Sequence, residues 1–119
     1  MNVPNNNDNT SADEVEFEYT GEGCVVPKNV TIARFHPSVI EVENWAFQYC
    51  NKLRGVVFND GLQKIKGSAF SWCTSLEKIT FPSTLKEVGQ LSFDTCERLR
   101  EVVFNDGLRK IGFRAFAGC

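Results

Sequence analysis

Eight of the ten phenylalanines in this chain fall into two columns in which neighbours are 23 residues apart. The members are Phe35, Phe58, Phe81 and Phe104 in one column, and Phe47, Phe70, Phe93 and Phe116 in the other. Helices and strands have short periods of about 3.6 and 2 residues, so no single element produces this spacing. A period of about 20 to 50 residues is typical of solenoids, in which each repeat packs on the next.

Other apolar columns keep the same period. They include Leu62, Leu85 and Leu108 after Val39; Ile65, Val88 and Ile111 after Val42; and Cys50, Cys73, Cys96 and Cys119. The residues between these columns vary. A position that stays apolar in every repeat while its neighbours change is expected to face one continuous core.

The spacing within one repeat predicts its local structure. Leu53-x-x-Val56-x-Phe58 ends in period-two alternation, which indicates a strand. Asn59-Asp60-Gly61 follows as a turn, and Leu62-x-x-Ile65 as a second short strand. Residues 67–73 lack alternation, and one helical turn would place Phe70 and Cys73 on the same face. Stacked repeats would pair their strands at about 4.8 Å.

The register Leu-x-x-[Val/Ile]-x-Phe, followed by Leu-x-x-[Ile/Val]-x-x-x-Ala-Phe-x-x-Cys, resembles the BspA-type leucine-rich repeat over roughly residues 24–119. In the common leucine-rich consensus an Asn or Cys comes shortly after the strand, whereas here the Cys follows the Ala-Phe pair. The resemblance implies an α/β repeat solenoid: a right-handed, curved stack of about four rungs, at residues 30–52, 53–75, 76–98 and 99–119. It also implies use in adhesion or protein binding, and no catalytic residues.

The N-terminal part differs from the repeats. Residues 1–13 are rich in Asn and nearly free of apolar side chains, so we expect a disordered tail. Residues 14–29 contain the alternating segment Glu14–Tyr19, and Tyr19 lies 23 residues before Val42. We interpret 14–29 as a degenerate repeat that caps the first rung.

At the other end, the sequence stops at Cys119 without a polar terminal repeat. The last rung is then expected to expose apolar side chains and open strand edges. Two expectations follow: the chain is a fragment of a longer protein, or it forms an end-to-end homodimer through this rung.

Composition excludes several classes of function. The net charge of −2 gives no sign of the basic face that a nucleic-acid partner requires. Apolar runs are too short for a membrane span of about 20 residues, and no signal peptide is visible. Free cysteines and the lack of a leader favour the cytoplasm; a fragment of a surface or secreted protein is the alternative.

Three roles are considered for the five cysteines: disulfides, a metal site or a catalytic site. Stacked cysteines form a line and no Cys-x-x-Cys pair occurs, so zinc is not indicated. We expect a column of buried free thiols. His36, the only histidine, is expected at a surface turn. With no nucleophile–base pair, metal cluster or phosphate loop, we expect no enzyme, no cofactor and no metal.

Partner-binding residues are therefore sought among the variable positions. Alternation turns one strand column outward: Arg34, Val57, Thr80 and Val103. Lys78 and Glu101 belong to a second column, with Ile32 and Gly55. Tyr49 and Trp72 share a column in the predicted helical turns, where they either anchor a partner or pack on each other. The column Arg54, Glu77 and Arg100 is interpreted as structural, through charge pairs between rungs.

These patterns predict a non-catalytic protein–protein interaction module with an unidentified protein partner. The alternative is a structural or assembly element that self-associates through its last rung.

Overall fold

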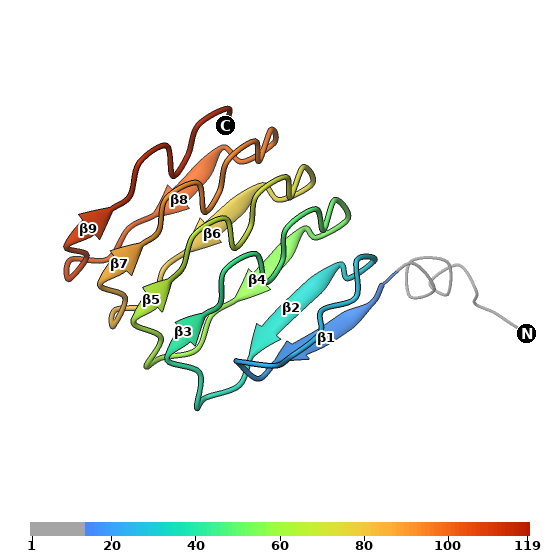
Figure 1. Cartoon of the computed structure of the whole chain (residues 1–119), viewed down its shortest axis with the longest axis horizontal. Coiled ribbons are helices and arrows are strands. Elements are labelled where there is room, and N and C mark those ends of the chain that lie inside the picture. Colours follow the sequence, from blue (N-terminus) through green and yellow to red (C-terminus); the bar gives the residue numbers. More distant parts are fainter. Residues whose placement is uncertain (1–13) are drawn as a thin grey trace, which may run out of the picture.

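The computed structural model describes residues 14–119, so the predicted disorder of residues 1–13 lies outside the described part. The backbone coils through stacked rungs, each formed by one repeat (Figure 1). The strands are β1 (Glu16–Tyr19), β2 (Ile32–Phe35), β3 (Glu41–Val42), β4 (Gly55–Val57), β5 (Lys64–Ile65), β6 (Lys78–Thr80), β7 (Glu87–Val88), β8 (Glu101–Val103) and β9 (Lys110–Ile111).

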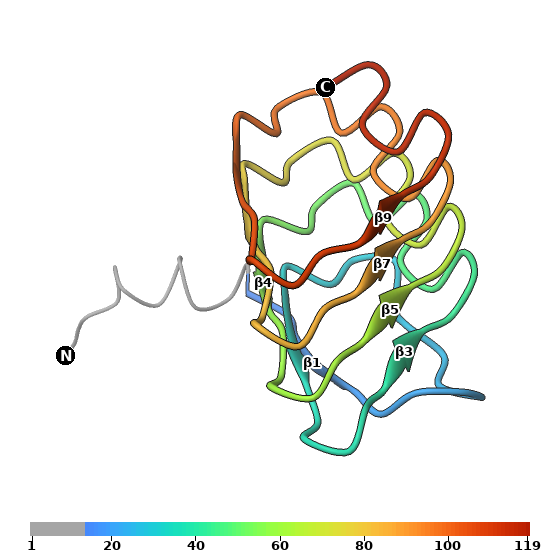
Figure 2. The same ribbon diagram turned by 90° about the vertical axis from the view of Figure 1, so that its left-hand side faces the viewer.

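Each rung contributes a longer strand to one side of the solenoid and a two-residue strand to another side (Figure 2). We call these the long-strand line (β1, β2, β4, β6, β8) and the short-strand line (β3, β5, β7, β9). Every strand pairing within residues 14–119 is parallel. From β2 onward, partners are one repeat apart: Ala33 lies opposite Val56, and Ile65 opposite Val88. The predicted solenoid of stacked, parallel-strand rungs is confirmed.

The two phenylalanine columns fill the core between these lines. In the column that starts at Phe47, neighbouring rings lie parallel within 6° and their centroids are 5.0 to 5.3 Å apart. The rings of the other column are tilted, and Phe58 meets Phe70 edge to face at 5.9 Å. The ring spacing matches the spacing of paired strands, about 4.8 Å, so the same side chain fits in every rung.

The segment after each short strand is not helical, so the predicted helical turn is wrong. Seven non-glycine residues in these segments have φ between 54° and 65°: Trp45, Tyr49, Ser68, Trp72, Leu91, Thr95 and Arg114. The N–H groups of Trp45, Phe47 and Tyr49 donate to carbonyls of the next rung at 2.7–3.2 Å. A helical turn would instead direct its N–H groups along its own axis. The left-handed residues thus flatten the segment and bond it to its neighbour.

β1 covers the first rung, but in a register different from the one expected. Glu16 lies opposite Ile32 and Tyr19 opposite Phe35, an offset of 16 residues rather than 23. Tyr19 therefore extends the Phe35 column, with ring centroids 5.1 Å apart, and does not occupy the column of Val42. Its hydroxyl accepts a hydrogen bond from the Glu43 N–H at 3.0 Å.

The turns between the two strands of each rung alternate between two types that hydrogen-bond to the preceding rung. The buried Asn59 amide donates to the carbonyls of Val39 at 2.9 Å and Pro37 at 3.3 Å. In the next rung, the Thr84 hydroxyl accepts from the Gly61 N–H at 2.9 Å and donates to the Leu62 carbonyl at 2.7 Å. Both turn types thus supply hydrogen bonds between rungs.

The backbone ladder of the long-strand line is interrupted once. β1, β2 and β4 form one sheet and β6 and β8 another, whereas the short-strand line is continuous. In the part of the chain that the structure describes, no backbone hydrogen bond joins β4 to β6. We call this place the β4–β6 seam.

The rung 99–119 exposes apolar side chains that are covered in the other rungs. Phe104 is 51 % exposed, against 4 % for Phe81 in the same column, and Ile111 is 49 % exposed, against 1 % for Val88. Phe113 is 72 % exposed. These side chains of the rung 99–119 are therefore open to solvent.

Candidate interaction surfaces

The outward positions of the long-strand line form a continuous surface. Arg34 lies opposite Val57, and Thr80 opposite Val103. All four side chains are exposed, because the alternate residues of each strand point into the core. With Lys78 and Glu101 they form what we call the strand face. The structure places the six residues predicted for it in two paired groups along this line: Arg34 with Val57, and Lys78 and Thr80 with Glu101 and Val103.

The charges of the strand face form exposed pairs. Lys78 Nζ lies 3.8 Å from a Glu101 carboxylate oxygen, and Arg34 Nε lies 3.4 Å from Glu16. Exposed pairs of this kind contribute about 0–1 kcal/mol to stability. They can therefore exchange partners at little cost.

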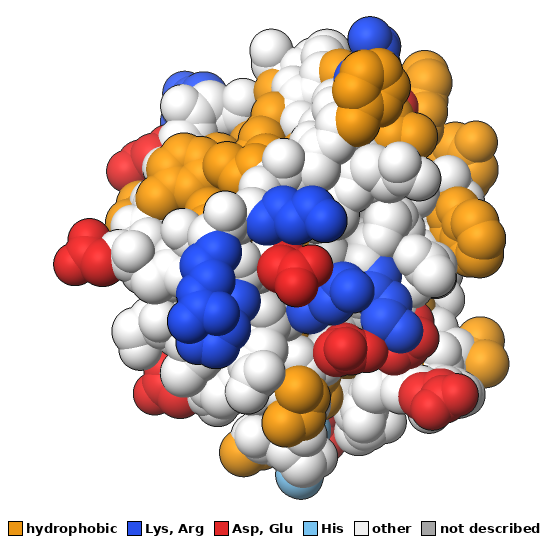
Figure 3. Space-filling view, turned by 60° about the vertical axis from the view of Figure 1, so that its left-hand side comes forward, with side chains coloured by type: hydrophobic (Ala, Val, Ile, Leu, Met, Phe, Trp, Pro, Cys, Tyr) orange, Lys and Arg blue, Asp and Glu red, His pale blue; other side chains and the backbone are white. Residues whose placement is uncertain are grey.

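The short-strand line presents a different surface, on which acidic and basic side chains lie side by side (Figure 3). Lys66 Nζ lies 3.1 Å from both Glu41 and Glu43, and Lys64 lies 3.8 Å from Glu87. Hydrogen bonds to Glu43 and Glu41 raise the pKa of Lys66. The charges of this surface are largely satisfied by one another.

Tyr49 and Trp72 come from the turn segments, a different part of each rung from the strand face. They are 54 % and 43 % exposed, and their ring centroids are 6.3 Å apart. Trp45 is 61 % exposed. Tyr49 and Trp72 thus pack on each other and also remain open to solvent, while their use as anchors for a partner stays a prediction.

The cysteines are unpaired, and their thiols are used in the core. Cys73 and Cys96 are buried, and each Sγ donates to the carbonyl of a phenylalanine in the preceding rung at 3.2 Å. A side-chain hydrogen bond with Cys96, and then burial, raises the pKa of Cys73. Burial raises the pKa of Cys50. Such thiols are held in the unreactive neutral form.

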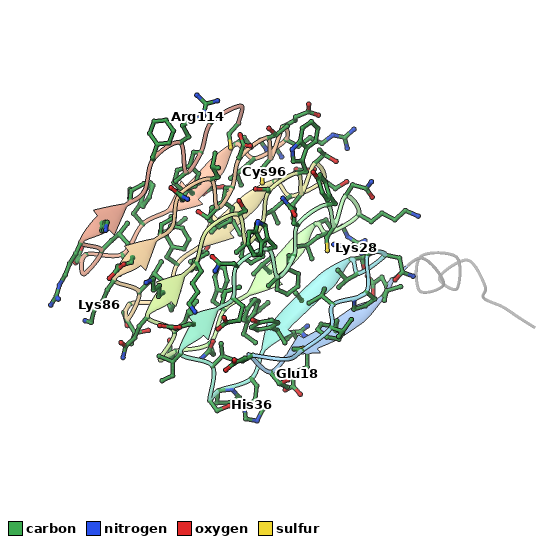
Figure 4. The ribbon with its side chains drawn as sticks, in the orientation of Figure 1. Glu18, Lys28, His36, Lys86, Cys96 and Arg114 are labelled. Carbon is green, nitrogen blue, oxygen red and sulfur yellow. The ribbon has the colours of Figure 1, made fainter. Side chains whose placement is uncertain are left out.

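Other predicted features have structural partners. His36 lies in a turn, as expected, where its Nδ1 accepts the Ser38 N–H at 3.0 Å (Figure 4). In the column interpreted as structural, Arg100 pairs with Glu77 at 2.9 Å. Arg54 of that column instead pairs with Glu14 of the capping segment at 2.8 Å. Within residues 14–119, no cluster of three or more possible metal ligands occurs.

A charged groove was missed in the sequence. It has a volume of about 380 Å³ and is lined by Thr31, Lys52, Arg54, Ser75, Glu77 and Arg98. These residues lie just before β2, β4, β6 and β8, at the ends where the strands begin. The sequence does contain a sign of this groove, because Lys52, Ser75 and Arg98 follow one another at intervals of 23 residues. We call this site the basic groove.

The fold defines a class: a solenoid of short repeats stacked through parallel strands, with one aromatic core. Residues 19–119 match the model of the BspA-type leucine-rich repeat region, and the chain belongs to this family. No curated protein matches it.

Two solved structures show the same fold. One is a leucine-rich repeat protein from Bacteroides ovatus, with a TM-score of 0.79 and 29% identity over 87% of this chain. The other is the leucine-rich repeat protein of T. pallidum, with a TM-score of 0.78 and 32% identity over 86% of this chain. The chain spans 28% and 48% of these two proteins, respectively.

In residues 14–119 there is no helix of the length and apolarity that crossing a membrane requires.

Proposed function

We propose that this chain is a non-catalytic protein-interaction module and that a protein partner binds its strand face. The observation that carries the proposal is the exposure of two valines among charged residues on the long-strand line: Val57 of β4 is 50 % exposed and Val103 of β8 is 40 % exposed. Interfaces combine an apolar centre with a polar rim, and this face offers both. Protein binding is also the general use of leucine-rich repeat solenoids, which supports the proposal by analogy.

The local chemistry supports binding rather than catalysis. The thiols of Cys50 and Cys73 are neutral and buried in the core, and His36 lies beside a serine in a turn. The exposed pairs Lys78–Glu101 and Arg34–Glu16 can open to meet charges on a partner at small cost.

The test is affinity enrichment from the native host with the wild-type chain and with Val57→Arg. Gln63→Arg is the matched control, since Gln63 is also exposed but lies beside the short-strand line. We expect one protein to be enriched by the wild type and the control, and lost with Val57→Arg. Its binding is then confirmed with the purified partner by calorimetry. Equal enrichment by all three chains would contradict a site on the strand face.

A second candidate is self-association through the rung 99–119. The observation that favours it is the exposure of Phe104 and Ile111, whose equivalents in other rungs are buried. Open strand edges and apolar side chains at one rung favour pairing with another chain.

A further inference from the structure

The basic groove lies where the strand ladder is interrupted. Between β2 and β4, the N–H groups of Arg54 and Gly55 donate to the Thr31 carbonyl at 2.9 and 3.2 Å. Between β6 and β8, the N–H groups of Arg100 and Glu101 bond the Glu77 carbonyl in the same way, at 3.0 and 3.3 Å.

At the β4–β6 seam the equivalent bonds are missing. Among the described residues, the N–H groups of Glu77 and Lys78 make no hydrogen bond to the Arg54 carbonyl. Backbone polar groups require partners, so these are left to solvent or to a ligand.

The charges lining the groove are predominantly positive, although the whole chain carries a net charge of −2. Lys52 and Arg98 are exposed, and neither makes an ion pair within residues 14–119. The one carboxylate of the lining, Glu77, is already held by Arg100 at 2.9 Å.

The hydroxyls of the groove have partners already. Thr31 Oγ1 accepts the Val15 N–H at 2.9 Å, and Ser75 Oγ donates to the Asn51 carbonyl at 2.7 Å. The groups free to hold a ligand are therefore the Lys52 and Arg98 cations, together with the donors of Arg54 not used by Glu14. Ammonium and guanidinium groups only donate hydrogen bonds, so they favour a ligand with anionic oxygen atoms.

We propose that the basic groove binds a short, extended acidic segment of a protein partner. Carboxylates of the segment pair with Lys52 and Arg98, which line the groove. The proposal rests on the interaction function proposed above and adds the chemistry of the partner. It gives the chain two contact surfaces, the strand face with its mixture of valines and charges and this cationic groove.

The test uses a fluorescein-labelled peptide of alternating Asp and Gly residues, with a Lys-Gly peptide of equal length as a counterpart. Fluorescence anisotropy with the full chain should show saturable binding of the acidic peptide only, weakened as salt is added. Lys52→Gln combined with Arg98→Gln should weaken binding about tenfold, the change expected from losing two exposed charge pairs. The matched control is Lys86→Gln with Lys110→Gln, which removes the same charge at the short-strand line and should change binding less than twofold.

Equal weakening by both double variants would overturn the proposal, because binding would then follow net charge alone. Equal competition by inorganic phosphate and by unlabelled acidic peptide would also overturn it, since the site would then hold any anion. Val57→Arg separates this inference from the proposed function. If peptide binding survives Val57→Arg and no partner depends on Val57, the strand-face proposal fails and the groove stands. If Val57→Arg abolishes partner capture and the peptide never binds, the groove proposal fails alone.

Discussion

At the residue scale, each core side chain packs against its own equivalent in the neighbouring rung. Phe70 lies between Phe47 and Phe93 with ring centroids 5.0 and 5.1 Å away. Cys73 also contacts the preceding rung, but through a hydrogen bond from its thiol to the Phe47 carbonyl at 3.2 Å. A cysteine in this column is therefore both a small apolar side chain and a weak donor.

Replacing a stacked ring should be costly only where the ring is buried. Phe70 is 0 % exposed, and Phe70→Ala should lower the free energy of unfolding by about 3–5 kcal/mol. Phe113→Ala is the same change at a side chain that is 72 % exposed, and should cost less than about 1 kcal/mol. Urea unfolding followed by circular dichroism measures both. Similar losses at the two sites would show that the stacking register described here is wrong.

The raised pKa of Cys73 gives stability a defined dependence on pH. The folded state keeps this thiol protonated, whereas the unfolded chain ionises it near pH 8.5. Above that pH the unfolded state therefore binds fewer protons than the folded state. The free energy of unfolding then falls as the pH rises, by at most about 1.4 kcal/mol per pH unit for one thiol.

The measurement is urea unfolding under reductant at pH values between about 8 and 9.5. The Cys73→Ala variant should show a shallower fall in stability than the wild type across this window. Parallel pH profiles for the two proteins would mean that Cys73 does not titrate differently on folding.

At the scale of elements, sequence reasoning succeeded for the strands and failed for the turn segments. Val56 and Ile65 revealed strands because alternation and β-branched side chains are local signals. The turn segments place Trp45, Tyr49 and Thr95 at positive φ, where glycine is the usual residue. The hydrogen bonds that offset this backbone strain are made with the next rung, so no local sequence pattern predicts the left-handed conformation.

Close approach between rungs at the short-strand line depends on glycine at two positions, Gly89 and Gly112. A Cβ added at Gly89 would lie 2.7–2.8 Å from backbone atoms of the preceding rung, near Lys66. Gly89→Ala should therefore destabilise the fold by about 1–3 kcal/mol, because backbone atoms must move.

Gly55→Ala is the matched control. Its added Cβ would lie 3.6 Å from the Ile32 side chain, an ordinary contact, and stability should change by less than about 0.5 kcal/mol. Thermal melts of both variants test the comparison. A tolerated Gly89→Ala would mean that the two rungs separate easily at this point.

At the scale of the whole molecule, periodicity predicted the stack, its register and the exposed strand face from Arg34 to Val103. It could not predict the β4–β6 seam, since the same 23-residue period runs across it and no single residue marks the break. The basic groove was missed for a related reason: Lys52 and Arg98 are two repeats apart and meet only when rungs are stacked. The column predicted for Tyr19 was wrong, because its spacing of 23 residues from Val42 is a coincidence and suggested the wrong partner.

The exposed rung 99–119 leads to the last prediction, which concerns assembly. Two copies that meet through this same rung would form a closed dimer, with Phe104 and Ile111 of each buried against the other. Sedimentation velocity in reductant should show dimers of the wild-type chain that increase with concentration. Ile111→Lys should keep the chain monomeric, because a charge would be buried at the contact. Val25→Lys adds the same charge in the capping segment, at a side chain that is 85 % exposed, and should dimerise like the wild type. A wild-type chain that stays monomeric at every concentration would rule out this contact and leave the rung to a different partner.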